Sequence, residues 1–224
     1  MKGIASERGV NELVNLHLVL GHVVADHSFT NNYKIRSYRG LKLVGHILWS
    51  WFALLAFTFD TLLKNPFSLG VLVSFSIIHA FGDVYRVKLY SAGKKRAIDL
   101  LELILLILVV IANSLVAKGL KGSYLSAEFV YYLLGMSVVS VGVTYLFRNF
   151  YPGVEDLPDV DGISERLAVF VFMLARKPLF VVISLVLGLL WRIWKYRRVD
   201  PTWYLSPALG LGLSFLWYLT LYSG

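Results

Sequence analysis

Two matching spacings place a histidine four residues before an aspartate, at His22–Asp26 and at His79–Asp83, and both lie inside apolar segments. Residues four apart on a helix lie on nearly the same face, so each imidazole and its carboxylate should point the same way. Ionisable side chains at membrane depth are costly and mark functional sites by default. Because His46 lies near the start of another apolar segment, the pattern predicts one buried polar site built by several helices.

Imidazole and carboxylate groups without thiolate suit Zn, Mn or Fe, and a pair spaced by four residues can supply two ligands to one divalent ion. We therefore expect four metal ligands: His22, Asp26, His79 and Asp83. His46 is expected to act as a general base or as an additional ligand. A metal with an open coordination position would activate water for hydrolysis.

The same spacing allows three other interpretations. Each aspartate can hold the second nitrogen of its own histidine and fix the tautomer, without binding the ion itself. The pairs can also be interhelical hydrogen bonds that only stabilise packing. A third interpretation is a proton or ion path, since buried histidine and aspartate residues build such relays.

The composition predicts an all-α polytopic membrane protein. Only 16% of the 224 residues are charged and 57% are hydrophobic, whereas soluble domains are about 25% charged. The net charge of +8 comes from basic residues in short loops, which is typical of membrane topology and argues against nucleic-acid binding. The absence of cysteine excludes disulfides, thiolate metal sites and cysteine nucleophiles.

Hydropathy predicts about six to seven membrane segments in one helical bundle. Their approximate limits are Asn11–Phe29, Leu41–Leu63, Phe67–Tyr85, Ile98–Ala117, Ala127–Phe147, the pair Ile163–Arg176 and Leu179–Trp194, and Trp203–Tyr222. The pair is expected to form a hairpin or one broken helix near Pro178. Residues 1–198 are expected to form the membrane domain that carries the His/Asp cluster. Residues 199–224 then form an additional C-terminal transmembrane helix that offers an aromatic-rich surface to a protein partner.

The basic loops Lys34–Lys42 and Arg86–Arg96 should be cytoplasmic. This orientation places the candidate residues of the first four segments at the cytoplasmic ends of their helices. Asp99 and Glu102 begin the fourth segment and are further candidates for the site. They are equally well explained as solvated carboxylates favoured by the helix N-terminus.

The order of these motifs resembles an uncharacterised prokaryotic integral-membrane family, domain of unknown function 3307. The run from Leu20 to Asp26, the later His46, and His79 with Asp83 match its pattern, as does Gly162-Ile-Ser-Glu165-Arg166-Leu167. The resemblance extends to about Arg198. This chain departs from it where the family has a histidine at the start of the fourth helix, near Glu102. The resemblance implies a prokaryotic protein and adds Glu165 and Arg166 as catalytic-site residues, with Arg166 holding an anionic head group.

These observations together predict a metal-dependent membrane hydrolase with its His/Asp site at the cytoplasmic leaflet of the cell membrane. Its substrate would be a lipid or another amphiphile that reaches the site from the bilayer. One alternative is a non-enzymatic structural subunit of a membrane complex. The other is an ion or proton transporter, although no inverted repeat is visible in the sequence.

Overall fold

The structure is a computed structural model, and it describes residues 13–28, 32–150, 159–197 and 201–222. Those residues form helices, turns and connecting segments, with no strand among them. The described residues divide into two compact units, one over residues 14–134 and one over the described part of residues 135–222. The predicted all-α fold is therefore confirmed, and each unit is described by itself.

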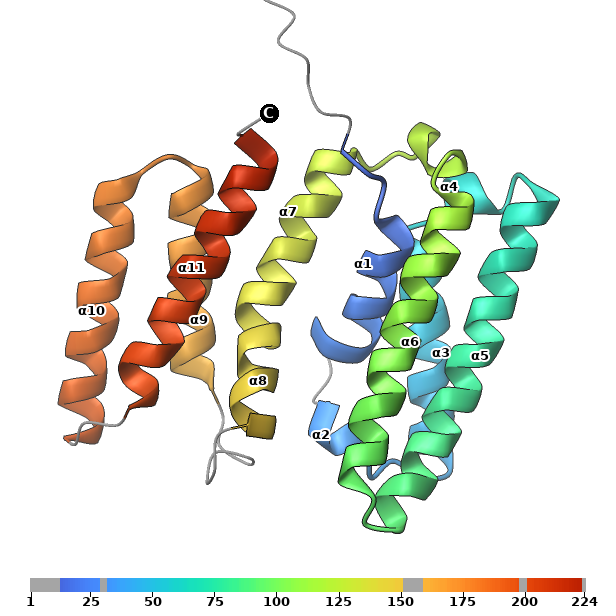
Figure 1. Cartoon of the computed structure of the whole chain (residues 1–224), viewed down its shortest axis with the longest axis horizontal. Helices are drawn as coiled ribbons and strands as arrows, with labels where there is room; N and C mark the ends of the chain where they lie inside the picture. Colours follow the sequence, from blue (N-terminus) through green and yellow to red (C-terminus); the bar gives the residue numbers. More distant parts are fainter. Residues whose placement is uncertain (1–12, 29–31, 151–158, 198–200, 223–224) are drawn as a thin grey trace, which may run out of the picture. The chain divides into compact units, whose positions relative to one another are not determined.

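The first unit begins with the short helix α1 and is built mainly from the longer helices that follow it, with shorter helical turns between them (Figure 1). Its elements are α1 (His17–Val23), the π-helix η1 (Val24–Ser28), α2 (Asn32–Ile35), α3 (Leu41–Ala56), α4 (Phe59–Leu62), α5 (Pro66–Ser91), α6 (Lys95–Val116), the 3₁₀ turn η2 (Gly119–Gly122) and α7 (Ala127–Ser137), which contains the boundary between the units.

The second unit continues from α7 and ends with three helices in sequence. Its elements are the π-helix η3 (Val138–Gly142), α8 (Val143–Phe150), α9 (Val160–Leu174), α10 (Pro178–Tyr196) and α11 (Thr202–Tyr222).

Five described helical stretches are long and apolar enough to cross a membrane. They are Pro66–Ser91, Lys95–Val116, Ala127–Phe147, Pro178–Tyr196 and Trp203–Tyr222. Three other segments from the sequence prediction are shorter: α3 has 16 residues, α9 has 15, and α1 with η1 covers His17–Ser28. A helix of 16 residues is about 24 Å long, less than the roughly 30 Å hydrocarbon core of a bilayer.

Helix α1 is short and polar, and its neighbours enclose it. It packs against both α3 and α6. The side chain of Asn113 on α6 accepts from the backbone N–H of Leu18 at 3.1 Å and donates to the carbonyl oxygen of Asn15 at 2.7 Å. A segment with low hydropathy can lie at membrane depth only when protein satisfies its polar groups, and this packing meets that condition.

Helices α5 and α6 form an antiparallel hairpin at the side of α3 and α1 (Figure 1). Asn65 caps α5, since its side-chain oxygen accepts from the backbone N–H of Phe67 at 2.9 Å, and Pro66 occupies the first helical position. The tight turn into α6 uses Gly93 at a φ of +69°, a conformation that glycine adopts without strain.

In the second unit, α9 and α10 run antiparallel and are joined by a short turn that ends at Lys177-Pro178 (Figure 1). This arrangement is the predicted hairpin and not a single broken helix. Helix α11 packs mainly on α9, so it belongs to the same compact unit as the hairpin. The division expected at residue 198 stays a prediction, whereas the contacts divide the chain at residue 134.

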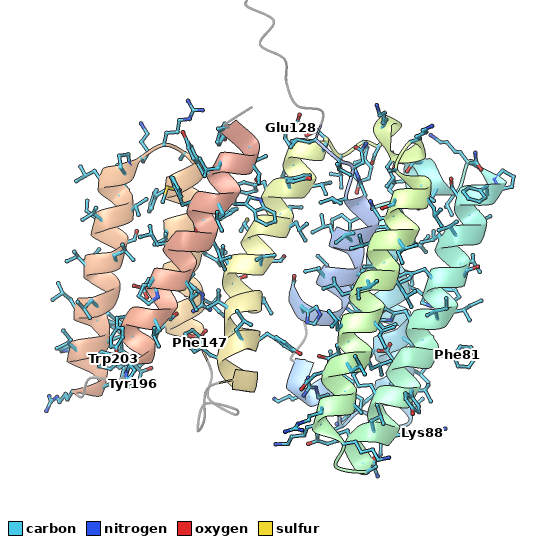
Figure 2. All side chains as sticks on the ribbon, in the orientation of Figure 1. Phe81, Lys88, Glu128, Phe147, Tyr196 and Trp203 are labelled. Atoms are coloured by element: carbon cyan, nitrogen blue, oxygen red, sulfur yellow. The ribbon has the colours of Figure 1, made fainter. Side chains whose placement is uncertain are left out.

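Apolar side chains cover the outer surfaces of the long helices. Figure 2 shows Phe81 projecting away from α5, where it is 72% exposed. Tyr196 and Trp203, at adjoining ends of α10 and α11, have ring centroids 5.9 Å apart. Exposed apolar surface with aromatic residues at helix ends is typical of membrane helices. The chain is therefore a multi-pass helical membrane protein.

Replacing Gly21 by alanine should destabilise the first unit, because a Cβ atom there would lie 3.1 Å from the Cα of Leu54 and 3.3 Å from the carbonyl oxygen of Ala53. Overpacking against backbone costs about 1–3 kcal/mol, so the thermal unfolding midpoint in detergent should fall. Gly70→Ala on α5 is the matched control, since a Cβ there meets nothing within 4 Å. An equal midpoint for both variants would contradict the close contact of α1 with α3.

Candidate functional site

A π-helical turn positions Asp26. Residues Val24–Ser28 continue α1 in the wider π geometry, and the indole N–H of Trp49 donates to the carbonyl oxygen of Ala25 at 3.2 Å. Single π turns within helices are frequent at functional sites because they redirect one or two side chains. Here the turn lies at the carboxylate that contacts α3 and α5.

Two buried carboxylates, Asp26 and Asp83, each face three basic side chains, His46, His79 and Arg86. His46 Nε2 lies 3.4 Å from Asp26 Oδ1 and 3.6 Å from Asp83 Oδ1. His79 Nε2 lies 3.4 Å from Asp26 Oδ1, and its Nδ1 lies 3.3 Å from Asp83 Oδ2. All five side chains are 2% exposed or less. The sequence-predicted residues of three separate segments therefore meet in one buried cluster.

Arg86 joins the two carboxylates through separate nitrogens. Its Nη1 donates to Asp26 Oδ2 at 3.3 Å, and its Nη2 donates to Asp83 Oδ1 and lies 3.4 Å from His46 Nε2. The sequence prediction treated Arg86 as the basic end of a membrane segment. The spacing Asp83-x-x-Arg86 was the available signal, because residues three apart on a helix are neighbours.

One oxygen of each aspartate is left without a hydrogen bond. Arg86 occupies Asp26 Oδ2 and Asp83 Oδ1, whereas Asp26 Oδ1 and Asp83 Oδ2 have no hydrogen-bond partner in the described structure. The imidazole nitrogens His79 Nε2 and His46 Nδ1 are also unpartnered there. Unsatisfied buried polar atoms are rare in native proteins and each one calls for an explanation, such as an ion.

The separations inside the cluster match those of atoms that share a metal ion. Nitrogen and oxygen ligands bind zinc at about 2.0–2.2 Å, which places two tetrahedral ligands roughly 3.4 Å apart. The imidazole–carboxylate separations of 3.3–3.6 Å lie at this value and exceed those of most N–H···O hydrogen bonds.

A second layer of charge lies beside the cluster. Arg36 binds Glu102 through Nη2 at 3.0 Å and Asp99 at 3.2 Å, and Arg86 Nη1 lies 3.8 Å from Glu102 Oε1. The side chain of Asp99 is 42% exposed, whereas that of Glu102 is 8% exposed. Glu102 therefore connects the buried cluster to a carboxylate at the surface of the unit.

The buried charges of these two layers do not balance. Three carboxylates, those of Asp26, Asp83 and Glu102, face two guanidinium groups, those of Arg36 and Arg86, and all five side chains are 8% exposed or less. One negative charge remains among the five. Buried charge in a medium of low dielectric constant must be compensated, either by a proton on an imidazole or by a bound cation.

Donor atoms converge in two sets that share Asp26. One set consists of Asp26, His46 and Asp83, and the other of His22, Asp26 and His27; within each set the ligand atoms lie within 4.8 Å of one another. The sequence prediction placed His22, Asp26, His79 and Asp83 around one ion. In the structure, the ring of His22 contacts the ring of His79 edge-on, with centroids 5.0 Å apart.

The donor set of Asp26, His46 and Asp83 fits a divalent ion. It offers imidazole nitrogen and carboxylate oxygen, the ligands that Zn, Mn and Fe accept. The aspartate oxygens that face His46 Nε2 are Asp26 Oδ1, which has no hydrogen-bond partner in the described residues, and Asp83 Oδ1, which Arg86 binds. His79 then resembles an outer residue, because its Nδ1 faces Asp83 Oδ2 and its Nε2 faces Asp26.

Glu165 and Arg166 lie in the other unit, where they have their own partners. Arg192 pairs with Glu165 and donates to the carbonyl oxygen of Trp203 at 2.8 Å. Arg166 donates through Nε to the carbonyl oxygen of Val139 at 2.7 Å. Its other two nitrogens donate to Ser140 O, Thr144 Oγ1, Asp159 Oδ2 and Ser206 Oγ.

Arg166 thus satisfies two carbonyl groups at the π turn η3, which the helix itself leaves available. This arrangement favours a structural role for Arg166, and a role for Glu165 or Arg166 at the His/Asp cluster stays a prediction. The sequence prediction did not include Asp159 or Arg192. Asp159 lies at the N-cap of α9 and pairs with Arg166 on the same helix, whereas Arg192 on α10 pairs with Glu165 on α9, a contact that no regular spacing reveals.

Comparisons with protein-family models, with curated proteins and with solved structures give no match to this chain.

Arg86→Met should strongly destabilise the protein, because it leaves Asp26 and Asp83 buried without their guanidinium. Removing one partner of a buried ion pair costs about 3–5 kcal/mol, so the thermal unfolding midpoint in detergent should fall markedly. Lys88→Met on the same helix removes an exposed cation and is the control. Equal, small changes in both variants would show that Arg86 does not compensate the carboxylates.

Proposed function

We propose that the protein is a metal-dependent membrane hydrolase whose His/Asp cluster acts on a lipid or another amphiphile. The observation that carries this proposal is the convergence of imidazole and carboxylate ligand atoms from Asp26, His46 and Asp83 in one buried cluster. A divalent ion held there would supply an activated water at neutral pH.

The protein's own residues have separate tasks in this proposal. Asp26, His46 and Asp83 hold the ion, and Arg86 orients both carboxylates by binding one oxygen of each. His79 turns its Nδ1 toward Asp83 at 3.3 Å, so its Nε2 is the atom placed to accept or return a proton beside Asp26. Asp26 and Asp83 come from different elements, which makes the site dependent on the packing of η1 against α3 and α5.

The substrate class follows from the surroundings of the cluster. The cluster is buried in a unit whose outer helix faces are apolar, and its ionisable neighbours Glu102 and Asp99 lead toward one end of that unit. An amphiphile in the bilayer can bring a polar group to this depth while its apolar chain stays in lipid. With the basic loops on the cytoplasmic side, the site would lie at the cytoplasmic leaflet of the cell membrane.

The resemblance to the prokaryotic membrane family, domain of unknown function 3307, is carried as part of this proposal. It rests on the order of His22, Asp26, His46, His79 and Asp83 and on the later Glu165-Arg166. It supports the choice of site residues and the location of the protein in a prokaryotic cell membrane, but it does not indicate which reaction the protein catalyses.

A structural subunit of a membrane complex is the second candidate. The contact that favours it is the bridge from Arg86 to Asp26 and Asp83, which ties η1 to α5 through the protein's own cation. In this case the cluster only stabilises the bundle, and α11 is the surface for a protein partner. The two candidates differ in whether the cluster binds a metal.

Metal content of the purified full chain tests the proposal. After reloading with zinc in detergent, the wild type should hold metal in stoichiometric amount, and Asp26→Asn should lose it because both donor sets contain Asp26. His46→Gln should lose the metal ion that is held by the donor set of Asp26, His46 and Asp83. His17→Gln is the matched control, since His17 is a buried histidine of α1 whose Nε2 lies 3.0 Å from the carbonyl oxygen of Leu125.

Hydrolysis of amphiphilic carboxylic and phosphoric esters in mixed micelles, followed with the same variants, tests the reaction. Zinc-dependent turnover that falls at least about 100-fold in His46→Gln and persists in His17→Gln is expected, as for loss of a general base or ligand. A folded wild type that binds no stoichiometric zinc, manganese or iron would remove the hydrolase proposal and favour the structural subunit.

A further inference from the structure

The π turn at Val24–Ser28 brings a second histidine pair to one face. Five residues of an α-helix separate two side chains by about 140° around the axis, so His22 and His27 would point apart. A π-helix closes its hydrogen bonds from residue i to residue i+5 and therefore holds more residues per turn than an α-helix, so residues five apart lie nearer to one face, and His27 lies inside the π turn. The two rings accordingly approach edge-on, with centroids 6.2 Å apart.

We propose that His22, Asp26 and His27 form a second divalent-cation site that shares the Asp26 carboxylate with the first. The three residues present ligand atoms within 4.8 Å of one another. This inference rests on the proposed function and extends it from one ion to a pair of ions bridged by Asp26. In hydrolases with two metal ions, the ions lie about 3.5–4 Å apart and act together on one substrate.

An unpartnered buried nitrogen supports the second site independently of the spacing. His22 is 2% exposed, and its Nδ1 has no hydrogen-bond partner in the described residues. Burying such a group without a partner costs on the order of 1–3 kcal/mol. A bound cation would satisfy both this nitrogen and Asp26 Oδ1, which is also unpartnered.

His79 lies between the two donor sets. Its ring lies edge-on to His22, at 5.0 Å between centroids, while its Nε2 lies 3.4 Å from Asp26 Oδ1 and its Nδ1 faces Asp83. His79 therefore contacts members of both sets. The half-buried His27 and Ser28 lie at the rim of the second set, where water can complete the coordination of the ion.

Manganese binding distinguishes one ion from two. The metal-free full chain in detergent is titrated with Mn²⁺, bound equivalents are counted after gel filtration, and the low-temperature electron paramagnetic resonance spectrum is recorded. Wild type should bind two equivalents and give an exchange-coupled spectrum. His22→Gln and His27→Gln should each bind one equivalent and give the spectrum of an isolated ion.

His17→Gln serves as the control and should keep two coupled ions, because His17 belongs to neither donor set. Elution volume and thermal midpoint establish that each variant is folded. If His22→Gln does not fold, the half-buried His27→Gln carries the test.

The remaining outcomes separate the two proposals. One equivalent in wild type, unchanged in His27→Gln and lost in His46→Gln, would overturn the second site and leave the hydrolase proposal standing. Two uncoupled equivalents that persist in His27→Gln would also overturn it. No bound equivalent in wild type would remove both.

Discussion

The structure of the first unit depends on how two carboxylates are compensated inside an apolar bundle. Asp26 and Asp83 come from η1 and α5, and neither can stay ionised at this depth without positive charge nearby. Arg86 binds both, while His46 and His79 each face both. These ion pairs fix the position of η1 against α5, because a shift of either element would separate Arg86 from one of the two carboxylates. Beside them, Glu102 lies 3.8 Å from Arg86 and binds Arg36, so the charged network continues beyond the two aspartates.

Much of this arrangement could be predicted from the sequence because it follows from periodicity. The spacing of His79 and Asp83 places both on one face of a regular α-helix, and His79 Nδ1 indeed faces Asp83 at 3.3 Å. Apolar runs located most of the long helices closely, but α5 continues to Ser91, beyond the predicted end at Tyr85, and α3 ends at Ala56, before the predicted Leu63. The turn at Lys177-Pro178 marked the hairpin of α9 and α10. The alternation of basic loops predicted that His46 and Asp83 lie at the same end of their helices.

The rest depends on local geometry and on partners that sequence spacing does not reveal. The π turn changes which residues share a face with His22, so His27 joins a donor set with Asp26. Arg166 was expected to hold an anionic head group, yet its nitrogens bind carbonyl groups of η3 and side chains of its own unit. Side chains at irregular spacings on separate helices make these contacts, and a single sequence carries no signal for them.

Anomalous scattering at the zinc absorption edge, from crystals of the zinc-loaded full chain, tests the central claim most directly. The account predicts a peak bound by Asp26, His46 and Asp83, with each ligand atom about 2.0–2.2 Å from the ion. Well-ordered Asp26 and Asp83 side chains without any anomalous peak beside them, and with all four oxygens hydrogen-bonded to protein or water, would contradict it.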